Sequence, residues 1–134
     1  MAPQPTMFTR TFDEALDLII EAHNYMAHVS PREFRPDSAV GGLYYSCEAF
    51  RLTARLTQAM AWLMMQRAVQ EGEVTQDEAL RESNRLSGHD ICLDAASIDD
   101  PRLPSGLRSL LARSYSLYLR VSRLEEMTMA RIAV

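Results

Sequence analysis

Residues 38–71, SAVGGLYYSCEAFRLTARLTQAMAWLMMQRAVQE, decide the fold. They read as one helix, because Asp37 and Ser38 are good N-cap residues and Gly72 sits where a C′ glycine would end it. At about 100° per residue its apolar positions cover an arc of roughly 220°, whereas a surface helix needs only about 100°. We therefore expect this helix to be central and to pack against at least two neighbours. The larger side chains of the arc are Leu43, Cys47, Phe50, Leu52, Leu56, Met60, Leu63 and Met64.

The remaining stripe of the same helix is polar in its middle and carries the only tryptophan, Trp62. Two interpretations stand: a long loop of the same chain covers Trp62, or the stripe is a subunit or partner interface, since interface cores favour Trp, Met and Tyr. For the second, we predict that two central helices pack across a two-fold axis, with Trp62 and Met65 at the apolar centre and Arg51, Arg55 and Gln58 toward the rim. The candidate interface residues are Tyr44, Arg51, Arg55, Gln58, Trp62, Met65 and Val69.

Further helices are predicted on both sides of residues 38–71. A capping box at residues 11–14 starts a helix that runs to about residue 28, and a second capping box at residues 75–78 starts a short helix that ends by about residue 86. Residues 88–104 lack periodicity and are expected to form an irregular loop. Ser105 can cap a last helix that reaches about residue 132. The sequence thus predicts an all-α, antiparallel bundle of three long helices and one short helix.

Length and composition limit the possible functions. The 134 residues predict a single domain, 1–134, with residues 1–7 as a disordered end. The net charge of −4 argues against a nucleic-acid partner bound through phosphates. All 14 basic residues are arginine, which excludes Schiff-base chemistry and a Walker A loop. No segment is long and apolar enough to predict a membrane span or signal peptide, so we expect a cytoplasmic protein with two unpaired cysteines.

No residue pattern predicts an active site, a cofactor or a metal. His23 lies within an apolar stripe and is expected to be a hydrogen-bonded core histidine rather than a ligand. His89, Asp90 and Cys92 are metal-binding residue types, but no fourth ligand at a known spacing completes a zinc site. The residues alone therefore predict a helical interaction protein. The alternative is a small DNA-binding regulator that uses residues 75–86 as a recognition helix, although acidic residues offset Arg81 and Arg85 there.

Several segments resemble the family of RcdA, the regulator of CtrA degradation. The resemblance lies in CEAFRLTARLTQ at 47–58, AWL at 61–63, QRAV at 66–69, EGEVT at 71–75, FDEAL at 12–16 and LP at 103–104. It implies a helical-bundle homodimer without enzymatic activity that acts as an adaptor for the ClpXP protease. Such an adaptor helps to deliver cell-cycle regulators, among them response-regulator-type cargo, often at a cell pole. Characterised members carry a flexible C-terminal tail, and this sequence ends at Val134, just past the last predicted helix.

Overall fold

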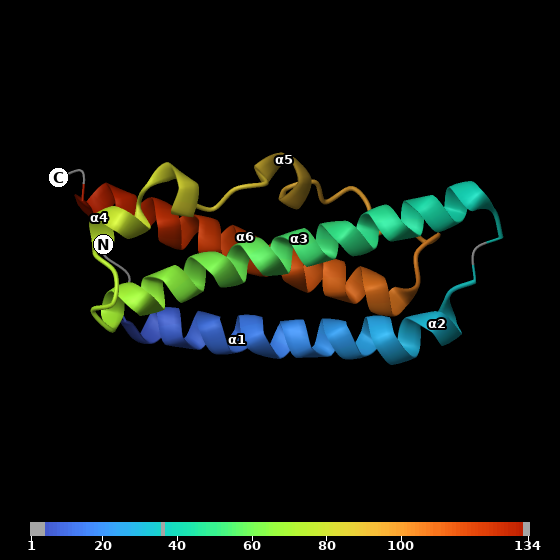
Figure 1. The fold of residues 1–134 in the computed structure, drawn as a ribbon. Coiled ribbons are helices and arrows are strands. Elements are labelled where there is room, and N and C mark those ends of the chain that lie inside the picture. Colours follow the sequence, from blue (N-terminus) through green and yellow to red (C-terminus); the bar gives the residue numbers. More distant parts are fainter. Residues whose placement is uncertain (1–4, 36, 133–134) are drawn as a thin grey trace.

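Three long helices lie side by side in the computed structural model, which describes residues 5–35 and 37–132 (Figure 1). They are α1 (Pro5–Asn24), α3 (Ala39–Gln70) and α6 (Ser105–Ile132). A π-helical turn, η1 (Tyr25–Val29), and α2 (Ser30–Glu33) extend α1, and the short elements α4 (Gln76–Ala79), η2 (Glu82–Asn84) and α5 (His89–Cys92) lie between α3 and α6. The described residues contain no strand, and the predicted all-α bundle is confirmed.

Helix α3 is the central element because it packs against both α1 and α6. Its predicted ends are confirmed within one residue: the Ser38 hydroxyl accepts a hydrogen bond from Gly41 N at 2.9 Å, and Gly72 has a φ of 76°, which favours glycine. The core between the three helices consists mainly of leucine. Its largest fully buried apolar side chains are Trp62, Tyr118, Leu52, Leu63, Leu107, Leu110, Leu111 and Leu117.

Helix α6 runs in the same direction as α3, and α1 is antiparallel to both of them (Figure 1). The reason is the segment 71–104, which returns along the length of the bundle before α6 begins. Residues 71–104, which we call the return segment, contain α4, η2 and α5. The short helix that the sequence predicts up to about residue 86 is α4, and it ends at Ala79. Its capping residue is as predicted, since Thr75 Oγ1 accepts from Glu78 N at 3.2 Å.

Helix α1 begins at Pro5, not at the expected capping box. Thr11 is buried inside the helix and caps nothing, so the prediction for residues 11–14 is wrong. Proline fits a first helical turn because the missing N–H has no partner there in any case. Of the end predicted to be disordered, residues 5–7 belong to α1, and residues 1–4 lie outside the described residues.

Close approach and ion pairs join α1 to α6. A Cβ on Gly106 would lie 2.3 Å from the Tyr25 ring, so the start of α6 reaches the end of α1 only because residue 106 has no side chain. On the surface, Arg113 forms a bidentate ion pair with Glu21, with both N–O distances at 2.6 Å. Arg120 binds Glu14 in the same way about two helical turns further along.

Candidate functional site

The polar stripe of α3, predicted to be an interface, is covered by the chain itself. Trp62 is only 1% exposed and lies against Phe8 of α1, with 5.9 Å between the ring centroids. The same chain thus covers Trp62, as the first interpretation expects, but the aromatic contact comes from helix α1 and not from a long loop. The placement of Trp62 at the centre of a dimer interface is therefore wrong, because a side chain buried within its own subunit has no surface left for a second copy.

Arg55 was expected at the rim of that interface and is instead fully buried, at 0% exposure. Its guanidinium donates to three main-chain carbonyls: Nε to Cys92 at 2.9 Å, Nη1 to Leu111 at 2.9 Å and Nη2 to Asp94 at 2.6 Å. It also lies over the Tyr115 ring, 5.1 Å from the centroid. Burial lowers the pKa of Arg55, and the nearby Arg51 lowers it further. The side chain is thus a clamp that holds the end of α5 against α3 and α6.

Close to the Arg55 guanidinium, the carboxylate of Glu48 binds the turn that follows α5. Glu48 is buried and accepts from Ser97 Oγ at 2.6 Å and from Arg51 Nε at 3.0 Å. Arg51 Nη1 in turn donates to the carbonyl of Ile91. Arg51 therefore binds the return segment of its own subunit, and this use competes with its predicted role toward a partner.

The ends of the stripe are also engaged within the chain. Gln58 Oε1 accepts from the Ser87 main-chain N–H at 3.1 Å, and the Tyr44 hydroxyl donates to Asp100 at 2.7 Å. Met65 and Val69 are half-buried. Each predicted interface residue with a polar side chain thus makes at least one hydrogen bond to residues 87–100, so this part of α3 holds the return segment and is not an open surface.

The open surface of α3 is on the opposite side. Phe50 is 74% exposed, Leu43 66% and Met64 57%, although the sequence pattern placed all three in the buried arc. None of the exposed residues of α3 from Ala39 to Met64 is charged. We call this surface the uncharged face; its residues are Ala39, Val40, Leu43, Ser46, Cys47, Phe50, Thr53, Thr57, Ala61 and Met64. The signal for it was present in the sequence, as a run of apolar and small residues at steps of three and four from Leu43 to Met64.

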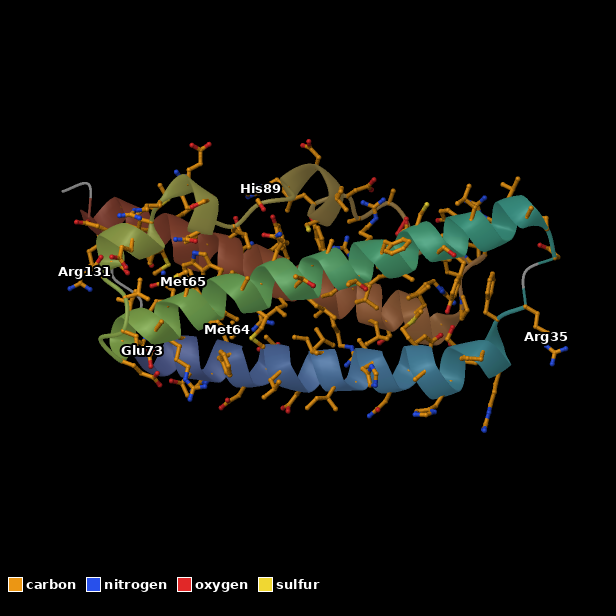
Figure 2. The ribbon with its side chains drawn as sticks, viewed as in Figure 1. Arg35, Met64, Met65, Glu73, His89 and Arg131 are labelled. Atoms are coloured by element: carbon orange, nitrogen blue, oxygen red, sulfur yellow. The ribbon has the colours of Figure 1, made fainter. Side chains whose placement is uncertain are left out.

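A shallow groove of about 560 Å³ borders the uncharged face, where α3 meets α1. Ile19, His23 and Met26 of α1 line one side, and Met60 and Met64 of α3 line the other. Figure 2 labels Met64 on the part of α3 that faces α1. Leu16 and Ile20 of α1 are also exposed, but neither lines this groove, and Ile20 lies instead at the junction of α1 with α6. Together the two helices offer one broad apolar surface.

His23 lies at this groove and is exposed, so the expectation of a buried, hydrogen-bonded histidine is wrong. Cys92, one of the metal-capable residues, is fully buried, and burial raises the pKa of its thiol. Within residues 5–35 and 37–132, no three His, Cys, Asp or Glu side chains are placed to share a metal ion. No helix in the same residues combines the length and apolar composition that crossing a bilayer requires.

Comparison with known proteins identifies relatives of this fold and sequence. The family described as "Protein of unknown function (DUF1465)" matches residues 2–133. The crystal structure of RcdA from Caulobacter crescentus CB15 is similar to this chain with a TM-score of 0.72 and 35% sequence identity, over 91% of each chain. No curated protein sequence matches significantly.

Proposed function

Because this chain belongs to the DUF1465 family and shares its fold with RcdA, we propose that it is a non-catalytic adaptor in regulated proteolysis. In this role it helps to deliver protein cargo of the response-regulator type to the ClpXP protease in the cytoplasm. The observation that carries the proposal is the 35% identity to RcdA over 91% of both chains. A broad uncharged surface on a rigid bundle supports it, since such a surface suits binding to other proteins.

The adaptor role is tested by protein turnover in cells that lack the gene. After translation is stopped, quantitative mass spectrometry follows the half-lives of ClpXP substrates and of response regulators. We expect at least one response regulator to persist longer in the deletion strain, and normal turnover to return with the wild-type gene. Unchanged half-lives for all response regulators and ClpXP substrates would contradict the role.

We further propose that the protein acts as a homodimer formed through the uncharged face. The residues at steps of three and four along this face follow the spacing of a coiled-coil seam, which packs one helix against another. Phe50 and Met64 lie equally far along α3 from Thr57. If two copies of α3 run antiparallel across a two-fold axis at Thr57, each Phe50 meets Met64 of the second copy, and the small side chains of Thr53 and Ala61 leave room for them.

The size of the surface agrees with a dimer that also uses α1. From Leu43 to Met64, α3 is about 32 Å long at about 1.5 Å per residue. Two helices spaced about 10 Å apart present a width of roughly 20 Å. The product, roughly 600 Å² per copy, is at the lower end of stable interfaces, which bury about 1,200–2,000 Å² in total.

Sedimentation at micromolar concentration tests this dimer. We expect wild type to be dimeric and Phe50→Glu to be monomeric, because the substitution places a charge at the centre of the apolar contact. The matched control is Ser116→Glu at an exposed position of α6, which adds the same single negative charge on a helix outside the proposed interface. A monomeric wild type, or a Phe50→Glu variant that stays dimeric, would refute the proposed face.

A further inference from the structure

Among the residues that the structure describes, His23 is the only titratable side chain that lines the groove between α1 and α3. All other lining residues are alanine, leucine, isoleucine, methionine or threonine. The groove shares Thr53, Thr57, Ala61 and Met64 with the uncharged face. A second copy that covers the uncharged face therefore also closes over the groove and over His23.

The carboxylates of α1 that are nearest to His23 in the sequence face α6 and not the groove. Asp17 and Glu21 both line the clefts between α1 and α6. Arg113 of α6 already holds Glu21 in a bidentate ion pair. Neither carboxylate is therefore placed to pair with a positive charge on His23.

The charged groups of α3 and η1 lie outside the groove as well. Glu48, Arg51 and Arg55 of α3 bind one another or the return segment. Arg67 lies at another cleft, near the end of α3, and His28 of η1 is exposed but does not line the groove. The groove thus offers no counter-charge to a protonated histidine.

We propose that protonation of His23 separates the two copies of the homodimer, so that association weakens as the pH falls. The proposal rests on the dimer through the uncharged face, for which it names a means of regulation. In the single chain His23 is exposed, and water solvates either form of its ring. In the dimer the second copy brings its own uncharged face over the groove, so a protonated ring loses water and gains no carboxylate. The neutral ring is therefore the form that associates.

The size of the effect follows from the ordinary titration of histidine. A solvated histidine changes charge near about pH 6.5, whereas most Asp and Glu side chains keep their charge down to about pH 5. If the dimer admits only the neutral ring, each histidine raises the dissociation constant about tenfold between about pH 7.5 and about pH 5.5. A two-fold dimer contains two such histidines, so the expected increase is about 100-fold.

Sedimentation of the full chain over a range of concentrations tests the proposal, at about pH 7.5 and about pH 5.5 and at equal ionic strength. We expect the dissociation constant of wild type to rise by about 100-fold, and by no less than about tenfold. His23→Gln is neutral at both pH values, so its dissociation constant should change by less than about threefold. The matched control is His28→Gln, which removes an exposed histidine outside the groove and should respond to pH like wild type. Circular dichroism should show the same helix content at both pH values.

Wild type alone supplies a second measurement. At about pH 6.5, dissociation of one dimer should take up about one proton, because each released histidine becomes half protonated. Calorimetric dilution in two buffers of different ionisation enthalpy measures this uptake. The proposal is overturned if wild type dissociates without taking up protons, if its dissociation constant changes by less than about threefold, or if His23→Gln responds to pH as wild type does.

These outcomes separate the pH dependence from the dimer itself. A wild type that is monomeric at about pH 7.5 removes the dimer and, with it, the regulation. A dimer of equal strength at both pH values removes the regulation alone and keeps the uncharged face as the interface.

Discussion

Replacing Arg55 by methionine should release the return segment from the bundle. Methionine keeps an unbranched stem and a high helix propensity, so α3 itself should persist. The change removes a donor from the buried carbonyl of Cys92 and another from the partly buried carbonyl of Asp94, whereas the carbonyl of Leu111 still accepts from Ser114 Oγ at 3.0 Å. A buried carbonyl without a donor costs about 1–3 kcal/mol. Together with a smaller cost at Asp94 and the lost packing on Tyr115, the change should lower the free energy of unfolding by roughly 3–5 kcal/mol.

Thermal unfolding and hydrogen exchange measure this effect. For a chain of this size about 1 kcal/mol corresponds to about 3–5 °C, so the midpoint should fall by roughly 10–20 °C. Amides of residues 86–104 should exchange faster, while those in the middle of α1 keep more of their protection. The control is Arg113→Met, which removes an exposed ion pair with Glu21 and should cost less than about 1 kcal/mol. If Arg55→Met is as stable as Arg113→Met, the inference that Arg55 holds the end of α5 against α3 and α6 is wrong.

Three further predictions concern the core and the cysteines. Trp62→Ala should lower the free energy of unfolding by about 3–5 kcal/mol, measured by urea denaturation, and leave the dimer dissociation constant of the folded protein within about twofold; a large effect on association alone would contradict its burial. Gly106→Ala should lower the thermal midpoint, because its Cβ would lie 2.3 Å from the Tyr25 ring, and the added change Tyr25→Ala should reduce that extra loss. In native protein diluted until it is monomeric, iodoacetamide should label Cys47, which is exposed in the single chain, and it should label the fully buried Cys92 only after unfolding, as mass spectrometry of digests can show; equal labelling rates would refute the placement of α5.

The bundle and the limits of α3 were predictable from the sequence because caps and periodicity are local signals. The faces of α3 were harder to predict. Periodicity shows which residues share a face, but it does not show what covers that face. A helix packed on another helix needs apolar side chains, whereas an irregular segment needs partners for its main-chain N–H and C=O groups. Arg55 and Arg51 supply such partners, so the polar stripe is buried and Phe50, on the apolar arc, is left exposed.

The predicted start of α1 and the predicted interface at Trp62 are wrong for related reasons. Thr11 and Glu14 have the spacing of a capping box, yet the helix continues upstream because Phe8 packs on Trp62. Tertiary contact outweighed the local signal, as it often does where a propensity is worth less than about 1 kcal/mol. The same contact helps to bury the tryptophan on which the predicted interface depended. The sequence of residues 87–104 has no hydrophobic periodicity, so it does not indicate which face of the bundle this segment packs against.

The energetics of the uncharged face argue that α1 must share in any dimer. Full burial of a side chain such as Leu43, Phe50 or Met64 contributes about 1.5–3 kcal/mol to association. Each of the three is already partly covered in the single chain, so burial in a dimer contributes only part of this amount. Six such side chains across a two-fold axis thus contribute roughly 6–12 kcal/mol, whereas association costs about 4–15 kcal/mol in lost freedom of motion. At the midpoints of these two ranges the contribution about equals the cost, so the seam of α3 alone leaves little net affinity. Ile19 and Met26, which line the groove from the side of α1, must therefore be buried as well if two copies are to associate at micromolar concentration.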